Sequence, residues 1–338
     1  MLYLRDPQRL VARGRRLGPV WRFHHISLGP IPVVSDRAMA EEVLVAALPV
    51  SRSWRYTPWL GAMSPLTTTP PRTAVRQQLA ELMNRALAST DPRQHILTAL
   101  SPARTHEVDV GPGLRRAALA WLVESLCQTP RCRTVLAAAE AWSVRAATLP
   151  LLVPFARHGH AGWSGLASAR ARLIGALAEH SIGAALDTHA GAWLSGAVLA
   201  LLGPFADALA MLAMSVLAMC DPYPEMRIAR ALGAPPMPLV IFEADRYAQL
   251  RRAALQLDVW PCSELCDGSH VAVDLGGAGL PFGAGLGGPL LRDAAHRFMS
   301  EAIALASELD LTASGDVVLG RRRLCFGPVR LDMSRWAR

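Results

Sequence analysis

One acidic residue lies inside the most apolar stretch of the sequence. Between Gly191 and Cys220 the only charged side chain is Asp207. Burial of a carboxyl group is costly and raises its pKa, so such a group can serve as a general acid or base. It could protonate an alkene or remove a proton from a substrate. We therefore predict Asp207 as the catalytic residue, with an aspartate satisfied by a neighbouring backbone group as the alternative.

A glycine-rich segment, Gly276–Gly288, precedes a predicted helix at Leu290–Leu309. A loop of this kind before a helix can bind phosphate through its backbone N–H groups. The spacing does not fit the G-x-x-x-x-G-K-[ST] pattern of nucleotide-binding loops. Taken alone, the segment is weak evidence for a phosphate site.

Cys262, Cys266 and His270 form a C-x3-C-x3-H run. Structural zinc sites usually add a fourth ligand and have more closely spaced pairs. Turn residues surround this run, which favours unrelated thiols in a hairpin, and we predict no metal site. The six cysteines of the chain do not indicate a disulfide framework, and a reducing cytoplasm is the expected setting.

The composition indicates a large core rather than a charged binding surface. Hydrophobic residues make up 51% of the chain and charged residues 18%. The formal charge is +8, but every basic residue is arginine, which is typical of the codon bias of a GC-rich genome. No basic stripe with interleaved aromatic residues is present, so we expect no nucleic-acid partner. Residues 1–7 show no apolar signal region, and secretion is not expected.

The hydrophobic pattern predicts a mainly α-helical chain with small sheets in its N-terminal and C-terminal regions. Predicted helices cover Arg5–Arg16, Asp36–Leu48, Arg72–Ala88, Leu114–Cys127, Arg131–Ala147, Gly165–Leu186, 191–220, Pro238–Leu255 and Leu290–Leu309. Predicted strands cover Val20–Leu28, Pro32–Val34, Asp258–Pro261 and Val271–Leu275, followed by a β-rich tail. No long linker and no repeat divides the chain, so we predict one domain over residues 1–338.

The stretch from Gly191 to Cys220 is long enough to span a bilayer. Pro204 and Asp207 near its middle are costly in lipid, and no aromatic belt brackets it. We therefore predict a helix buried inside a helical protein and no membrane partner, with a membrane span as the alternative.

Several motifs stand in the order that one enzyme family uses. Thr69-Pro70-Pro71 begins a segment that runs to Leu87, and Glu243-x-x-Arg246 lies upstream of Phe282-x-x-Gly285. The last such segment runs from Leu311 to Leu331. This ordered set resembles the bacterial cytochromes P450 over nearly the whole chain. The resemblance implies a P450-like fold, a haem-type loop at Phe282–Gly285, and a buried structural pair of Glu243 and Arg246.

The residues that serve the haem in that family are replaced here. The family's loop reads F-x-x-G-x-x-x-C-x-G, and Pro289 stands at the cysteine position. The iron needs a thiolate, whereas proline has no donor atom. Phe205 and Ala206 stand where the long helix of the family has the acid and the alcohol that pass protons to iron-bound oxygen. Thr73 and Gln77 replace residues near the haem propionates. We therefore predict that the protein holds no haem.

The resemblance also suggests which residues would line a vacated haem space. The predicted substrate-binding residues are Phe205, Ala206, Met211, Arg252 and Phe282. The arginine resembles one that meets a haem propionate, and it could hold a different anion such as a diphosphate. The alternatives are a structural arginine and a methionine that only fills the core.

Two classes of function remain once redox chemistry is set aside. The first is a non-oxidative cyclase or isomerase of secondary metabolism that acts on an apolar terpenoid (prenyl diphosphate) or polyketide-like substrate. The sequence has no D-D-x-x-D cluster, so Mg²⁺ would take part only if a diphosphate is the substrate. The second follows from a resemblance to cysteine-less P450 homologues that activate glycosyltransferases in antibiotic biosynthesis. Such a protein binds a partner enzyme and needs no chemistry of its own.

Overall fold

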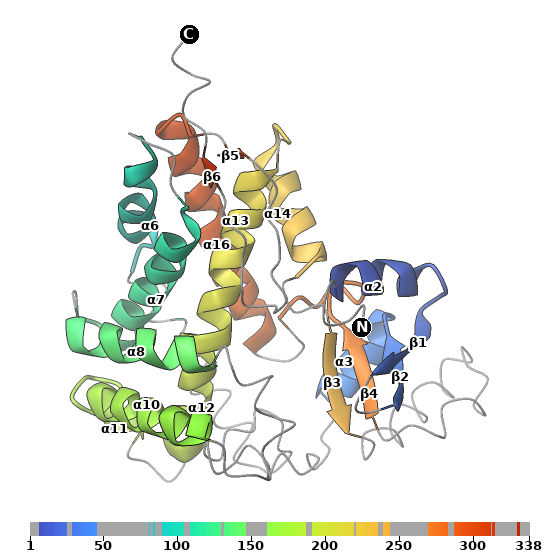
Figure 1. The fold of residues 1–338 in the computed structure, drawn as a ribbon, viewed down its shortest axis with the longest axis horizontal. Helices are drawn as coiled ribbons and strands as arrows, with labels where there is room; N and C mark the ends of the chain where they lie inside the picture. Colours follow the sequence, from blue (N-terminus) through green and yellow to red (C-terminus); the bar gives the residue numbers. More distant parts are fainter. Residues whose placement is uncertain are drawn as a thin grey trace.

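The computed structural model describes residues 7–25, 29–45, 81, 84, 90–104, 109–129, 132–146, 161–186, 191–219, 221–235, 239–243, 270–282, 287–311, 313–314 and 330–331. A body of helices lies beside a smaller sheet (Figure 1). The helices are α2 (Pro7–Arg15), α3 (Arg37–Val45), α6 (Arg93–Leu100), α7 (Gly111–Cys127), α8 (Arg133–Ala146), α10 (Ala161–Ala178), α11 (Gly183–Leu186), α12 (Gly191–Ala200), α13 (Ala206–Ala218), α14 (Pro224–Gly233) and α16 (Gly287–Glu308). The strands are β1 (Val20–His25), β2 (Gly29–Val34), β3 (Leu239–Glu243), β4 (His270–Asp274), β5 (Ala313–Ser314) and β6 (Arg330–Leu331). The predicted mainly helical class with small sheets is confirmed.

The larger sheet has the strand order β1-β2-β4-β3. It pairs the N-terminal hairpin with two strands from residues 239–274. β1 and β2 form an antiparallel hairpin, and β4 pairs parallel to β2 and antiparallel to β3. Along β1, Trp21 and Phe23 are buried while the residue after each is exposed, as expected for an edge strand with one covered face. The central strand β4 is buried from Val271 to Asp274, which is typical of a strand covered on both faces.

Two of the predicted helices differ from the structure. Residues 239–243 form strand β3 rather than the start of a helix from Pro238 to Leu255. The apolar run Leu-Val-Ile-Phe suits either element, and pairing with β4 selects the strand. The predicted helix Gly165–Leu186 is broken, because a turn at 179–182 separates α10 from α11. A Cβ at Gly183 would lie 2.1 Å from the Ala178 carbonyl oxygen, so this turn needs a glycine.

A buried carboxylate ties the sheet to α2 and to the glycine-rich segment. Arg15 donates from Nε and Nη2 to the two oxygens of Asp274, each at 2.7 Å. The Ser35 hydroxyl and the Gly277 backbone N–H add hydrogen bonds of 3.0 and 2.9 Å. A Cβ at Gly277 would lie 2.3 Å from Asp274 Oδ2, so this glycine allows the close approach. The N-terminal end of the glycine-rich segment, at Gly277, therefore packs against Asp274 and contributes to the fold rather than to a phosphate site.

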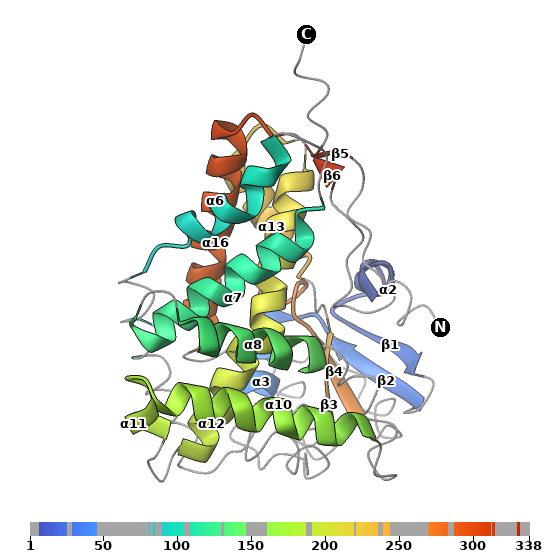
Figure 2. The same ribbon diagram turned by 60° about the vertical axis from the view of Figure 1, so that its left-hand side comes forward.

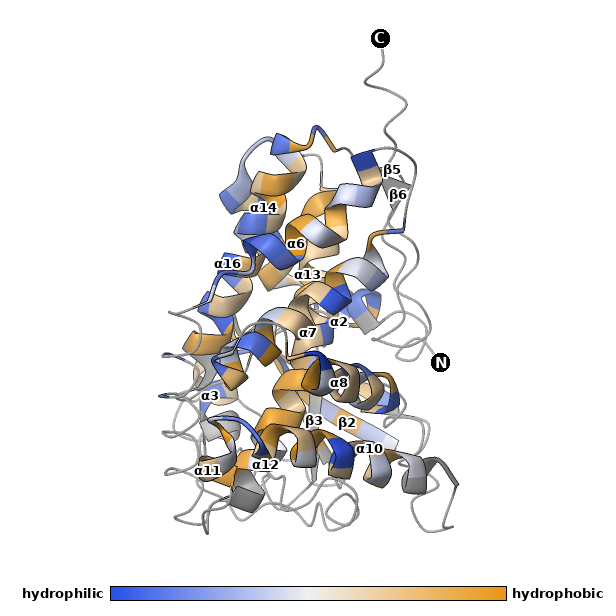
Figure 3. Cartoon of the chain, turned by 90° about the vertical axis from the view of Figure 1, so that its left-hand side faces the viewer, coloured by the Kyte–Doolittle hydropathy of each residue, from blue (hydrophilic) through white to orange (hydrophobic). Residues whose placement is uncertain are grey.

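A continuous apolar helix runs through the helical body. α12, a π-helical segment at Leu201–Phe205, and α13 follow one another without a break. α13 packs against both α7 and α16, and their relation can be followed in Figures 1 and 2. Figure 3 shows apolar residues along α12 and α13. The stretch Leu194–Ala218 is long and apolar enough to cross a membrane, but 82% of its most apolar 18-residue part is buried inside the protein. This burial supports the predicted core helix.

Candidate functional site

The central helix changes geometry where Pro204 lies inside the π-helical segment. In the i→i+5 pattern, Pro204 would be the donor to the Leu199 carbonyl, but proline has no backbone N–H. The Trp142 indole Nε1 on α8 donates to that carbonyl oxygen at 2.8 Å. Gly203 leaves room for the ring, because a Cβ there would lie 3.0 Å from Trp142 Nε1. Trp142 thus stabilises the irregular turn that ends at Phe205.

Phe205 and Phe282 meet between the central helix and the loop before α16. Their ring centroids lie 5.6 Å apart at an interplanar angle of 78°, an edge-to-face contact. Phe205 is 7% exposed, and Phe282 is half-buried against the same core. The structure therefore brings together two of the predicted substrate-binding residues and places them in direct contact with each other.

Asp207 has both of its carboxylate oxygens engaged by side chains of α7 and α8. Arg115 Nε lies 2.6 Å from Oδ1, and Arg115 Nη2 lies 3.3 Å from Oδ2. The Ser143 hydroxyl donates to Oδ1 at 3.4 Å and accepts from Arg115 Nη2 at 2.9 Å. Asp207 is 2% exposed, as predicted for this stretch. Its partners are side chains of two other helices rather than a neighbouring backbone group.

Burial raises the pKa of Asp207 to about 6, while the Arg115 charge and the hydrogen bonds from Ser143 and Arg115 act in the opposite direction. A carboxyl group with this pKa exchanges its proton near neutral pH, as a general acid or base must. No oxygen of the group is left without a partner, however. A catalytic role for Asp207 stays a prediction, and it would require the ion pair to open.

Asp207 and the aromatic pair face different sides of the central helix. Successive residues of a helix are rotated by about 100°, so Phe205 and Asp207 point about 200° apart. The contacts agree, because Phe205 meets the loop before α16 whereas Asp207 meets α7 and α8. Ala206 between them is fully buried, and Met211 is 1% exposed, one helical turn beyond Asp207. The predicted acid and the predicted aromatic lining thus do not converge on one site.

Other predicted site residues lie wholly or partly outside the described part of the chain. Arg246, Arg252, Thr73 and Gln77 fall outside it, as do Cys262 and Cys266. The backbone of Glu243 ends strand β3, and that of Pro289 lies in the first turn of α16. Glu243 thus lies at the end of a strand rather than in the predicted helix, while its pairing with Arg246 stays a prediction.

Comparison with known proteins rests on structure. No family model and no curated protein sequence matches the chain. A 6-coordinated cytochrome P450 from Thermus thermophilus superposes with a TM-score of 0.65 at 16% identity, covering 96% of this chain and 98% of that one. P450BioI, solved in complex with an acyl carrier protein bearing hexadec-9Z-enoic acid, gives a TM-score of 0.67 at 13% identity, covering 98% and 99%.

The chain has the cytochrome P450 fold. A third P450-fold structure, PksS of the bacillaene polyketide synthase from Bacillus subtilis 168, gives a TM-score of 0.62 at 12% identity, covering 98% of this chain and 97% of that one. Identities this low show the fold alone. The P450-like fold predicted from the ordered motifs is confirmed.

The residues present do not fit the haem that this fold holds in the cytochromes P450. In the cytochromes P450, the haem iron takes a thiolate from the loop that corresponds to the segment before α16. Oxygen binds on the other face of the haem, beside the central helix, so the haem lies between that loop and the central helix. Pro289, at the thiolate position, has no donor atom. Carbon atoms in contact lie about 3.5–4.0 Å apart, so a flat ring between two side chains needs about 7 Å between their nearest atoms. The Phe205 and Phe282 centroids are only 5.6 Å apart, which leaves no room for a porphyrin between them.

Sequence reasoning missed three residues that shape this region. Arg115 and Ser143 hold Asp207, and Trp142 holds the π-helical turn. Arg115 is one of many arginines, and only three-dimensional proximity to Asp207 distinguishes it. The sequence does contain a sign of the role of Trp142. Pro204 within a helix has no backbone N–H, so a donor from another element is needed for the carbonyl that it leaves unpaired.

Proposed function

We propose that this protein is a haem-independent, non-redox protein of the P450 fold that acts by binding a partner enzyme of natural-product biosynthesis. The observation that carries the proposal is the direct contact of Phe205 with Phe282. The two rings are in edge-to-face contact at 5.6 Å, which supports a space that no longer holds a haem. Pro289 supports the same conclusion, since it replaces the iron ligand.

The state of Asp207 favours binding over catalysis. Arg115 and Ser143 occupy both carboxylate oxygens, and the group faces away from the aromatic pair. An ion pair between three helices is well suited to keep a scaffold rigid. The partner we propose is a glycosyltransferase of antibiotic biosynthesis, as for the cysteine-less homologues that the sequence resembles. P450BioI, solved with an acyl carrier protein, is a P450-fold structure with a protein partner and so supports a docking role.

The test is to express deoxysugar glycosyltransferases of antibiotic pathways with and without this protein. We expect the soluble yield and the turnover of at least one of them to rise several-fold when the protein is present. Asp207→Asn is expected to keep this stimulation at temperatures where it is folded, because the carboxyl group does no chemistry. Absence of stimulation across the panel would contradict the proposal.

A non-oxidative cyclase or isomerase is the second candidate, and the pKa of Asp207 near 6 favours it. The substrate would be an apolar terpenoid (prenyl diphosphate) or polyketide-like chain, with Mg²⁺ only for a diphosphate. Incubation with farnesyl and geranylgeranyl diphosphate, with and without Mg²⁺, tests this directly. A product that wild-type protein forms and Asp207→Asn does not would replace the binding proposal with this one.

A further inference from the structure

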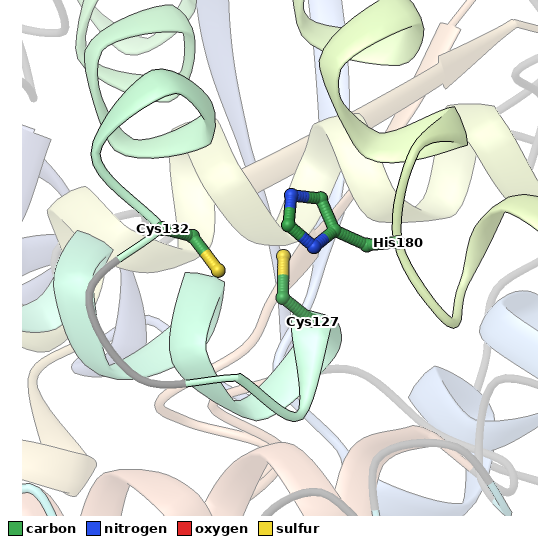
Figure 4. A group of neighbouring side chains, drawn as sticks. All are labelled: Cys127, Cys132 and His180. Carbon is green, nitrogen blue, oxygen red and sulfur yellow. The ribbon is translucent and has the colours of Figure 1, made fainter.

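Three potential metal ligands meet where helices α7, α8 and α10 end or begin. Cys127 is the last residue of α7, Cys132 directly precedes α8, and His180 lies in the turn after α10. The two sulfur atoms and a ring nitrogen of His180 all lie within 4.8 Å of one another. Figure 4 shows the three side chains converging from separate segments. Cys127 and Cys132 are also the only cysteines among the described residues, so both belong to this cluster.

The backbone around Cys127 is held in place from several sides. The α7 helix ends at Gln128 in the left-handed conformation, with φ 52° and ψ 28°. The Cys127 carbonyl oxygen accepts hydrogen bonds from the Thr129 hydroxyl at 3.2 Å and the Ser181 hydroxyl at 3.1 Å. Because Ser181 directly follows His180, the second bond fixes the histidine turn to the cysteine turn. The ligands therefore sit on a pre-organised frame.

Both sulfur atoms lie in a buried or half-buried setting, where each thiol keeps its proton until a cation replaces it. Cys127 is 1% exposed, and burial raises the pKa of its thiol to about 12, with the neighbouring Cys132 adding to the rise. Cys132 Sγ at present donates to the Thr129 carbonyl oxygen at 3.1 Å. A divalent cation would displace the two thiol protons and leave two thiolates whose charge balances its own.

We propose that Cys127, Cys132 and His180 form a zinc site that joins the ends of α7, α8 and α10. Two thiolates and one imidazole are a preferred ligand set for Zn²⁺. With Zn–S at about 2.3 Å and Zn–N at about 2.0 Å, tetrahedral ligand atoms lie about 3.5–3.8 Å apart. Since the present separations are at most 4.8 Å, the ligand atoms need to approach one another by no more than about 1.3 Å. Binding releases two protons, and with three protein ligands the fourth position goes to water.

A zinc ion at this site would tie together helices that surround the central helix. It would connect α10 to α7 and α8, which both pack against the central helix, and α8 supplies Ser143 to Asp207. The other cysteine pair, Cys262 and Cys266, lies outside the described residues and provides a matched control. The half-buried Cys132 and His180 are the positions to vary, because the fully buried Cys127 also serves the core.

The experiment uses reduced, metal-free full-length protein titrated with Zn²⁺ against a chromogenic chelator, and with Co²⁺ followed by absorption. We expect one zinc per chain, a thiolate–cobalt charge-transfer band, weaker binding at lower pH, and a higher Tm in zinc. Loss of an outer-shell partner already weakens a metal site about 10–100-fold, so Cys132→Ser and His180→Gln should each lose about 100-fold or more. Cys262→Ser should bind as the wild type does.

Three outcomes would overturn the zinc site. One is a reduced wild-type protein that takes up no zinc at micromolar free metal. Another is unchanged zinc affinity and cobalt absorption in Cys132→Ser and His180→Gln, with their folding confirmed by circular dichroism. The third is a Cys127–Cys132 disulfide found by mass spectrometry in protein purified without oxidant, since that bond would consume both ligands.

Discussion

Replacing Arg115 by methionine is expected to cost about 3–5 kcal/mol in the free energy of unfolding near pH 8. Arg115 is the cation that pairs with Asp207, whose carboxyl group is 2% exposed. Without it, a buried carboxylate keeps only the weak hydrogen bond from Ser143 at 3.4 Å. The methionine retains most of the side-chain volume, so the loss reports the charge rather than a cavity. Urea unfolding followed by circular dichroism measures it.

The Arg115→Met loss should shrink at low pH. Asp207 has a folded-state pKa of about 6, raised above the ordinary value of 3.8. A raised carboxyl pKa means that the folded state binds the proton more tightly, so this group lowers stability as pH rises from about 4 to about 6. Removing Arg115 raises that pKa further and moves the upper limit of the window higher. At pH 5 the variant's carboxyl group is largely protonated and less costly, so the difference from wild type should be smaller there than at pH 8.

The neighbouring Arg116 supplies the control. Its Nε lies 3.0 Å from Glu140 Oε1, but the two side chains are 70% and 37% exposed. Exposed ion pairs contribute about 0–1 kcal/mol, so Arg116→Met should change the unfolding free energy by less than about 1 kcal/mol at either pH. Equal losses in the two variants, or an Arg115→Met loss that is the same at pH 5 and pH 8, would show that the buried pair does not have the role described.

Replacing Trp142 by phenylalanine is expected to lower the free energy of unfolding by about 2–4 kcal/mol. The change removes the indole N–H that donates to the Leu199 carbonyl oxygen at 2.8 Å, while keeping an aromatic ring in the core. Pro204 cannot provide a replacement donor, so the buried carbonyl loses the hydrogen bond from Trp142. The π-helical turn that positions Phe205 should loosen, and faster amide exchange over residues 199–206 would report it.

Trp121 offers a matched comparison for that variant. It is also fully buried and stacks on Phe298 at 5.8 Å, but its Nε1 finds no acceptor among the described residues. Trp121→Phe therefore removes volume without breaking a hydrogen bond, and should cost only about 1 kcal/mol. Thermal or urea unfolding of the two variants side by side separates the hydrogen bond from the packing. A Trp121→Phe loss equal to or above the Trp142→Phe loss would contradict the role given to the Leu199 contact.

The sequence allowed the burial of Asp207 to be predicted, but not its partners. Apolar neighbours on both sides of Asp207 indicate a buried helix, and Pro204 and Asp207 within the stretch favoured a protein core over a membrane. Arg115 is 92 residues away along the chain and shares its residue type with every other basic residue, so no spacing connects the two. The same limit applied to Phe205 and Phe282, whose contact depends on how α13 and α16 pack.

Strand β3 shows where local pattern reasoning fails. The run from Leu239 to Phe242 has no period that separates a helix from a buried strand, and the choice is made by β4 from residues 270–274. The order of the motifs was more informative than periodicity. It predicted the P450-like fold although the identities to the P450 structures compared are only 12–16%. The prediction of a single domain and a cytoplasmic setting stays a prediction.

Haem binding is the most direct test of the central claim. The measurement is the visible absorption spectrum of protein expressed with excess haem precursor, reduced and treated with carbon monoxide, for the wild type and for Pro289→Cys. We predict no stoichiometric haem and no thiolate-type ferrous–CO band in the wild type. Pro289→Cys is expected to fail as well, because in the proposed account the Phe205–Phe282 contact occupies the place of the haem. One haem per chain with a thiolate-type ferrous–CO band in the wild type would contradict the account.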